Sequence, residues 1–160
     1  MSKHKLNLKL VETLVDNYKS RQLYSIENSV SYPMAFDARA AMFSLKALKS
    51  FIETIEEEVA KHPERPVENI GVRFYYTAYP ELKDWEDELF DELKPVPLDY
   101  TKLHTLVAVP TMEIAGVCYD FDPFDVNTYD GSKPADTGMG IMAENHGKLN
   151  PPFGVAGLWF

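Results

Sequence analysis

The sequence predicts an α+β fold: a single domain, residues 1–160, in which a main amphipathic helix packs on one face of a sheet. The sheet is expected to have about four strands and to be mostly antiparallel or mixed. Three observations predict this fold. Residues 44–61 carry apolar side chains at helical spacing, residues 69–78 alternate between apolar and polar side chains, and residues 103–109 are apolar on both faces.

The main helix is predicted over residues 44–61. Ser44 stands just before the first apolar residue, where its hydroxyl can accept a hydrogen bond from a free amide of the first turn. The apolar face repeats at spacings of three and four: Leu45, Leu48, Ile52, Ile55 and Val59. Because Ile52 lies at the centre of this face, we expect it to be fully buried against Val72 and Phe74.

Three segments are predicted before the main helix. Residues 7–20 have the apolar spacing of a first helix. The periodicity fails over residues 21–33, and residues 28–33 read as a loop or a short edge strand. Residues 38–43 have two interpretations. Their alanines favour an extension of the main helix back to a cap at Asp37, whereas a capping serine at position 44 favours a short strand that feeds the helix. We choose the strand.

Five further segments are predicted after the main helix. The strand at 69–78 places five apolar residues on one face: Ile70, Val72, Phe74, Tyr76 and Ala78. Residues 81–93 are expected to form a third helix, with an apolar seam and an otherwise acidic surface. The central strand at 103–109 is followed by a turn at 110–115 and a returning strand at 116–121.

From about residue 122 onwards regular structure is hard to find, because glycines and prolines are frequent. Such a segment is either a long ordered loop or a partly mobile tail. Its last residues are too apolar for a free tail, so we expect them to dock on the same molecule or on a neighbour and to offer a route to an oligomer: Phe153, Val155, Leu158, Trp159 and Phe160.

The composition excludes several classes of partner. The net charge of −9 comes from residues 81–94, with seven acidic and two basic residues, and from residues 120–130, with four acidic and no basic residues. Nucleic acids and anionic membranes are bound by basic surfaces, so we expect neither. No run approaches the roughly 18 apolar residues of a membrane span, and the N-terminus lacks the apolar core of a signal peptide. The single cysteine, Cys118, excludes an internal disulfide, so we expect a cytoplasmic protein.

Seven short segments are spread over most of the chain: Asp37-Ala-Arg39, Phe43-Ser-Leu45, Phe51-Ile52, Gly71-Val-Arg73-Phe-Tyr-Tyr, Tyr79-Pro80, His104-Thr-Leu-Val-Ala-Val-Pro110-Thr111 and Asn145-His-Gly147. In this combination the chain resembles an uncharacterised family of small bacterial proteins. In similar sequences the stretch before the capping serine is richer in bulky residues, which supports the strand at 38–43. The resemblance implies no activity.

The polar face of the strand at 69–78 is the candidate ligand site. Six residues of this face, the neighbouring segments and the C-terminal loop are candidate ligand-binding residues: Arg39, Arg73, Tyr75, Tyr79, His104 and His146. Guanidinium, phenol and imidazole groups together suit an anion. The alternative is a half-exposed strand that carries Arg and Tyr on its solvent side, and this alternative is favoured. No catalytic residue is assigned.

Arg73 needs an acceptor if it is partly buried, because a desolvated, unpaired guanidinium is costly. An internal acceptor would be Asp37 or the aspartate-rich loop that starts at Asp120; an external acceptor would be a bound anion near His104. We favour the internal pair.

The same loop carries five oxygen-bearing side chains: Asp120, Asp122, Asp125, Asn127 and Asp130. Calcium takes six to eight oxygens, but the spacing does not fit the calcium-binding loop of helix–loop–helix proteins. A solvated acidic turn, in which Asp and Asn bond local amides, is favoured. The histidines are far apart and Cys118 is predicted to be a buried apolar residue, so no zinc site is expected. We expect no metal and no cofactor.

These observations favour a non-enzymatic cytoplasmic binding or interaction protein, whose unknown partner is a small anion or another protein. The alternative is an enzyme that acts on a small anionic substrate through Arg73, Tyr75, His104 and the C-terminal loop. A concave site where these residues converge would favour a ligand or an enzyme, whereas a flat face would favour an interaction module.

Overall fold

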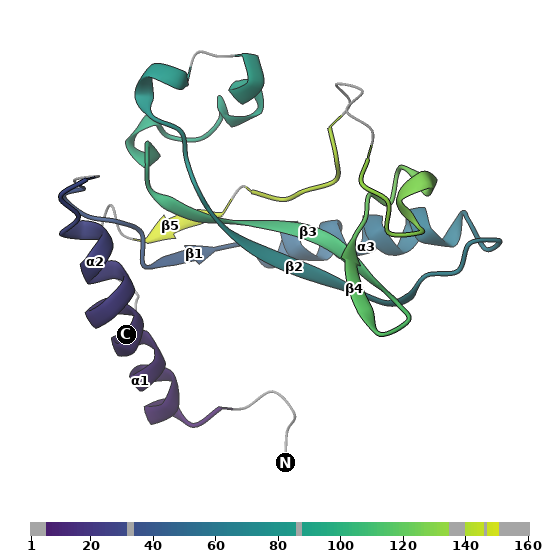
Figure 1. The fold of residues 1–160 in the computed structure, drawn as a ribbon, viewed down its shortest axis with the longest axis horizontal. Coiled ribbons are helices and arrows are strands. Elements are labelled where there is room, and N and C mark those ends of the chain that lie inside the picture. The colour runs from purple at the N-terminus through teal and green to yellow at the C-terminus, as the bar shows by residue number, and fades with distance from the viewer. Residues whose placement is uncertain (1–5, 32–33, 86–87, 135–139, 146, 151–160) are drawn as a thin grey trace. The chain divides into compact units, whose positions relative to one another are not determined.

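The fold is given by a computed structural model, which describes residues 6–31, 34–85, 88–134, 140–145 and 147–150 (Figure 1). The predicted α+β class is confirmed. The strands form a three-stranded antiparallel sheet and a separate two-stranded sheet, rather than one sheet of about four strands. Within the described residues, no helix has both the length and the apolar content that crossing a membrane requires.

The chain divides into two compact units. The first unit comprises Met1–Ala41, Tyr79–His104 and Leu149–Phe160, and the second comprises Met42–Ala78 and Thr105–Lys148. Each unit contains its own cluster of buried hydrophobic residues. The predicted docking of residues 153–160 and the predicted role of His146 lie outside the described residues.

In the first unit three helical segments follow one another without a break: α1 (Leu8–Tyr18), a π-helical turn (Lys19–Leu23) and α2 (Tyr24–Glu27). The helix predicted at 7–20 is therefore confirmed but longer, since it continues through residues 21–27, where the apolar spacing fails. Residues 28–31 form a loop, one of the two structures expected for 28–33. A π turn contains an extra residue, so the buried Leu23 follows Tyr18 by five positions. This break in the spacing hides the continuation of the helix.

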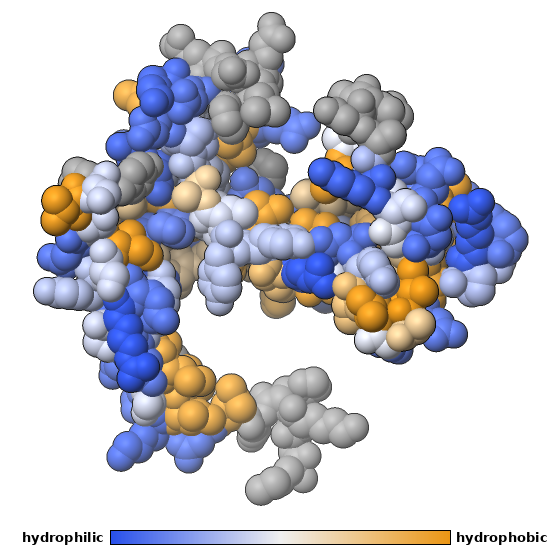
Figure 2. Space-filling model, in the orientation of Figure 1, coloured by the Kyte–Doolittle hydropathy of each residue, from blue (hydrophilic) through white to orange (hydrophobic). Residues whose placement is uncertain are grey.

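Helix α1 buries none of its residues. Leu10 and Leu14 are exposed, and Figure 2 shows hydrophobic side chains along one side of this helix. The helix is held in the unit at its other end, where Ile26 packs against the hydrophobic cluster.

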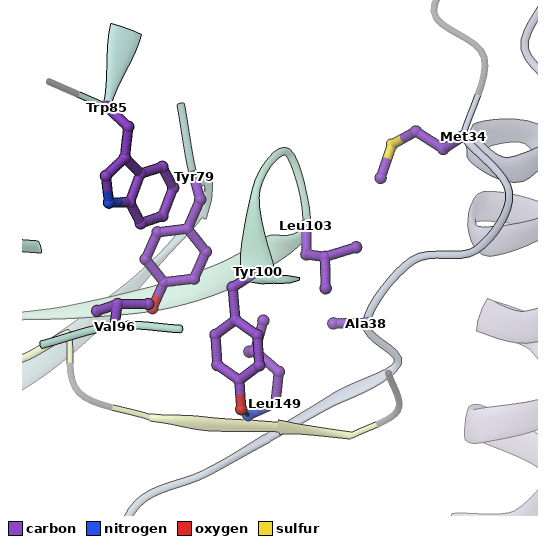
Figure 3. Close-up of a cluster of buried hydrophobic side chains, with 8 residues drawn as sticks. All are labelled: Met34, Ala38, Tyr79, Trp85, Val96, Tyr100, Leu103 and Leu149. Carbon is purple, nitrogen blue, oxygen red and sulfur yellow. Dashed lines mark hydrogen bonds between the residues drawn. The ribbon is translucent and has the colours of Figure 1, made fainter. Parts of the chain in front are cut away.

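That cluster is built around aromatic rings (Figure 3). The ring of Tyr79 lies with its centroid 6.0 Å from those of both Trp85 and Tyr100. The Tyr100 hydroxyl accepts a hydrogen bond from the Leu149 amide at 3.3 Å, which fixes the last described strand against this core.

The helix predicted at 81–93 is wrong. The described residues form short 3₁₀ helices: η2 (Leu82–Asp84) and η3 (Glu88–Leu93), with η4 (Leu98–Tyr100) after them. Acidic residues three and four positions apart repel one another on a regular α-helix, and this segment is dominated by them. The apolar residues of the predicted seam do not lie on one helix face. Trp85 and Leu93 pack on the aromatic core from separate turns.

The short strand predicted at 38–43 is confirmed as β1 (Ala40–Met42). It pairs with β5 (Lys148–Asn150) in the two-stranded sheet. The sequence did not predict β5, because it follows a long segment with no periodic pattern.

In the second unit the main helix is confirmed as α3 (Leu45–Ala60), and the Ser44 hydroxyl accepts from the Ala47 amide at 3.0 Å. The predicted buried face is confirmed at Ile55 and Val59 but is wrong at Ile52, which is 45% exposed. Phe51 is buried in its place, because its phenyl ring buries more apolar area than Ile52 would.

The three-stranded sheet has the order β2 (Glu68–Ala78), β3 (His104–Ile114) and β4 (Val117–Asp120). Thr111 lies opposite Asp120, and Ile114 lies opposite Val117. Phe51 and Ile55 of α3 form one hydrophobic cluster with residues of the sheet and of the loop after β4: Ala108, Met112, Phe121 and Tyr129.

The turn predicted at 110–115 is wrong, because β3 continues through it. The reversal is made by Ala115 and Gly116, both with positive φ (50° and 82°), as a tight hairpin turn requires. Pro110 is tolerated inside β3 since it lies at the end of β4. Its carbonyl accepts from the Phe121 amide at 3.1 Å, and Phe121 follows the last residue of β4, so the missing N–H of Pro110 lies at the end of the β3–β4 ladder.

Candidate functional site

The six candidate ligand-binding residues are distributed over both units. Arg73 and Tyr75 belong to the second unit, whereas Arg39, Tyr79 and His104 belong to the first. His146 is not among the described residues.

Arg73 and Tyr75 form a polar cluster with Asp120 on one face of the three-stranded sheet. Arg73 Nη1 lies 2.5 Å from Asp120 Oδ1, and its Nη2 donates to the carbonyl of Cys118 at 3.1 Å. The Tyr75 hydroxyl donates to the other carboxylate oxygen of Asp120. Arg73 stands on β2 and Asp120 on β4, so the pair reaches across β3.

This cluster satisfies the guanidinium internally. The hydrogen bond from Arg73 to the Tyr75 hydroxyl and the negative charge of Asp120 raise the pKa of Arg73 above its ordinary value. The acceptor comes from the aspartate-rich loop, as the internal-pair prediction expects. The positive charge is therefore neutralised by a neighbour rather than offered to an external anion.

A second polar pair lies in the first unit, where Asp37 meets His104. The Asp37 side chain is completely buried, and one of its oxygens accepts from the amides of Ala38 and His104, both at 2.7 Å. Its other oxygen contacts Nδ1 of His104, whose side chain is 39% exposed. A buried carboxylate that orients a half-exposed imidazole can hold one tautomer of the ring and leave Nε2 directed elsewhere.

The two other candidates of this unit have different environments. Tyr79 is a core residue, because its ring is buried between Trp85 and Tyr100. Arg39 is half-buried, and its Nε has no hydrogen-bond partner in the described part of the chain.

The aspartates after β4 bond local groups. Asp122 Oδ1 accepts from the Phe124 amide at 3.1 Å, Asp125 Oδ1 from the Asn127 amide at 3.0 Å, and Asp130 Oδ1 from the Ser132 amide at 2.8 Å. This is the arrangement of a self-bonded turn. Among the described residues, no group of three or more His, Cys, Asp and Glu side chains is placed to hold a metal ion.

One further prediction for this region is wrong: Cys118 is exposed rather than buried. It lies on the outer strand β4, one position after Val117, which pairs with Ile114 next to the turn. Its side chain lies on the face of the sheet that α3 does not cover.

A cleft of about 540 Å³ opens beside α3, between the helix and residues 141–144. Its helix side presents Lys46 and the hydroxyl-bearing residues Ser44, Ser50 and Thr54. None of the five described candidate residues lines it. The Ser44 hydroxyl caps the helix and the Thr54 hydroxyl donates to the Ser50 carbonyl, so both have structural roles.

The feature that sequence reasoning missed is the outer edge of β2. Contacts along β2 and β3 run in opposite directions: Asn69 Nδ2 donates to Glu113 Oε2 at 3.0 Å, Gly71 lies against Thr111, and Thr77 Oγ1 donates to the Thr105 carbonyl at 3.4 Å. Odd-numbered residues of β2 thus lie opposite odd-numbered residues of β3.

This pairing shows which backbone N–H and C=O groups of β2 point away from β3. Even-numbered residues of β3 face away from β2: Ala108 exchanges two hydrogen bonds with Glu144 (2.9 and 3.0 Å), and Pro110 accepts from Phe121. Odd-numbered residues of β3 therefore face β2, and the odd-numbered residues of β2 face β3. The even-numbered residues from 70 to 78 direct their N–H and C=O groups out of the sheet.

The side chains along this edge are apolar and exposed. Tyr76 is 89% exposed, and Ile70 and Phe74 are exposed as well. Sheet edges are commonly protected by lysine, proline or short length. β2 has eleven residues, and between Ile70 and Ala78 it contains no lysine and no proline.

The exposure of β2 has a geometric reason. The sequence assigned the even-numbered residues of β2 to the core beneath the main helix. A helix of 16 residues is about 24 Å long, whereas a strand of eleven residues is about 36 Å long. The helix covers Val72 but leaves much of the remaining strand uncovered.

A scan against models of protein families matches none, and neither curated proteins nor solved structures give a match. The resemblance to an uncharacterised bacterial family stays a prediction.

Proposed function

We propose that this chain is a non-enzymatic interaction module that binds an extended segment of another polypeptide by strand addition at β2. The observation that carries the proposal is an eleven-residue strand that, among the described residues, is paired on one side only, and whose outward backbone groups lie among exposed apolar side chains. A partner strand would extend the sheet through backbone hydrogen bonds, and its own apolar side chains would contact Phe74 and Tyr76.

The polar cluster supports a polypeptide partner over a small anion. Arg73 already has Asp120, Tyr75 and the Cys118 carbonyl as partners, so an anion would have to displace Asp120. The free, exposed thiol of Cys118 suits a reducing compartment and supports a cytoplasmic location.

Selection from a displayed library of random twelve-residue peptides tests the proposal. We expect the selected peptides to alternate apolar and polar residues, and to bind the wild type with at least about tenfold higher affinity than Tyr76→Lys. Fluorescence anisotropy with labelled peptides measures both affinities. Phe124→Lys is the matched control, because Phe124 is an exposed aromatic residue outside β2. Equal binding by Tyr76→Lys, or no selected peptide, would contradict the proposal.

The Asp37–His104 pair favours a second candidate function, an enzyme in which His104 is the general base for a small anionic substrate. Arg39, whose Nε has no partner among the described residues, is a cation of the same unit that would attract such a substrate. Assays with p-nitrophenyl acetate and p-nitrophenyl phosphate test this function. It requires turnover that His104→Gln abolishes and His62→Gln retains; absence of turnover in the wild type would reject it for these substrates.

A further inference from the structure

We infer that the polypeptide bound at β2 is a second copy of this chain, with the two β2 edges paired antiparallel about a twofold axis at Phe74. The inference rests on the proposed function, since it names the partner of the same edge. It follows from three properties of β2: the direction of its backbone groups, the side chains that symmetric pairing brings together, and the charges along the strand.

The backbone groups fit symmetric pairing. In an antiparallel pair centred on Phe74, this residue lies opposite Phe74 of the second copy, and even-numbered residues lie opposite even-numbered residues. The even-numbered residues are those whose N–H and C=O groups point out of the sheet. Phe74 and its even-numbered neighbours can therefore each exchange two hydrogen bonds with the second copy. The two three-stranded sheets become one continuous sheet of six strands.

The side chains are self-complementary in this arrangement. Val72 meets Tyr76 of the second copy, and Ile70 meets Ala78; a β-branched residue opposite an aromatic ring is a favourable cross-strand pair. On the other face Arg73 meets Tyr75 of the second copy. Within one chain the Arg73 guanidinium already lies 5.9 Å from the centroid of the Tyr75 ring, so this pairing repeats a contact that the strand makes by itself.

The charges do not oppose the pairing. Arg73 is the one charged residue between Ile70 and Ala78, and Asp120 neutralises it. The symmetric arrangement places no charge opposite a like charge. An edge that must reject its own copy needs a repulsive charge or a steric clash, and residues 70–78 supply no charge of this kind.

Size-exclusion chromatography with light scattering, run on the full chain over a range of concentrations, tests the inference. The wild type is expected to reach twice the mass of the chain, Tyr76→Lys to remain a monomer, and Phe124→Lys to dimerise like the wild type. Tyr76 is almost fully exposed, so its replacement leaves the fold intact. A wild type that is monomeric at every concentration would overturn the inference.

Disulfide cross-linking tests the register. Opposed residues of a hydrogen-bonded pair lie about 5.5 Å apart between Cα atoms, within the range of a disulfide. In a Cys118→Ser background, Phe74→Cys is expected to form a covalent dimer on mild oxidation, whereas Phe124→Cys remains a monomer. Equal cross-linking of the two variants would contradict the pairing at Phe74.

The outcomes separate this inference from the proposed function. A monomeric wild type that still binds selected peptides, with loss of binding in Tyr76→Lys, overturns the second copy as partner and leaves the interaction module standing. A dimer that survives Tyr76→Lys but is lost on deletion of residues 151–160 places the contact in the C-terminal segment and overturns the inference. Failure of both dimerisation and peptide binding overturns both.

Discussion

The Arg73 guanidinium and the Asp120 carboxylate join the two outer strands of the three-stranded sheet, with Nη1 2.5 Å from Oδ1. The pair spans the central strand, and Tyr75 donates to the same carboxylate. The sequence suggests a ligand site on this polar face. In the structure the Arg73 guanidinium is instead bound by Asp120, 47 positions further along the chain. The edge of β2, in contrast, stays exposed.

Replacement of Arg73 measures the strength of this pair. Arg73→Ala is expected to lower the free energy of unfolding by about 1–2 kcal/mol. Hydrogen bonds to charged groups usually contribute about 1.5–3 kcal/mol, but both side chains are about one third exposed (37% and 35%), so solvent screens the pair. Urea unfolding measures the loss. A rise in the wild-type melting temperature with phosphate or sulfate that disappears in Arg73→Ala would instead show that Arg73 binds an external anion.

Two isoleucines of α3 test which side of the helix faces the core. Ile55→Ala is expected to cost about 2–5 kcal/mol, because Ile55 is buried and its truncation leaves a cavity. Ile52→Ala is expected to cost less than about 1 kcal/mol, since Ile52 is partly exposed. Both values come from urea unfolding of otherwise identical chains. A loss of about 2–5 kcal/mol in both variants would show that Ile52 is buried as the sequence predicted.

Asp37 is expected to be a strong contributor to the stability of the first unit. Asp37→Ala should lower the free energy of unfolding by about 2–4 kcal/mol, because the buried amides of Ala38 and His104 lose their acceptor. Asp99→Ala, an exposed aspartate of the same unit, is the control and should change stability by less than about 0.5 kcal/mol. Similar losses in the two variants would show that the hydrogen bonds from the Ala38 and His104 amides to Asp37 do not stabilise the fold.

The ionisation of Tyr129 is expected to make the free energy of unfolding depend on pH in the alkaline range. Burial raises the pKa of Tyr129 above its ordinary value of 10.0, and the nearby carboxylates of Glu58 and Asp122 raise it further. Because the folded pKa exceeds the unfolded one, the stabilisation is present below about pH 10 and is lost as the pH rises through the folded value.

Tyr129→Phe isolates this effect. The variant should be less stable at neutral pH, since the hydroxyl donates to the Pro123 carbonyl at 2.9 Å. Its stability should fall less than that of the wild type between about pH 9 and pH 11. Urea unfolding at several pH values gives both slopes. Parallel slopes would mean that Tyr129 ionises equally well in the folded and unfolded chains.

The local patterns of the sequence predict the elements of the second unit well. The capping position of Ser44, the alternation along β2 and the doubly apolar β3 are each determined by neighbouring residues, so a single sequence reveals them. The π turn Lys19–Leu23 interrupts the helical spacing, and the pairing of β5 with β1 joins residues distant in sequence, so no periodic pattern predicts either of them.

The site was predicted less well for the same reason. The sequence shows that Arg73 needs an acceptor and names the aspartate-rich loop as one source, but strand order decides that Asp120 reaches it. It also shows that Phe74 and Tyr76 are apolar. Which apolar residues the helix covers depends on the rotation of α3, which buries Phe51 beside Ile55 and exposes Ile52.

Amide hydrogen exchange along β2, followed residue by residue by NMR, tests the central claim that this edge binds a polypeptide strand. It is measured in the dilute free protein and after addition of a partner strand, either a selected peptide or a high concentration of the chain itself. The amides of Arg73, Tyr75 and Thr77 are expected to be protected from exchange in both states. Those of Val72, Phe74 and Tyr76 are expected to exchange rapidly in the free protein and to become protected on binding. Outward amides whose protection is the same in both states would contradict it.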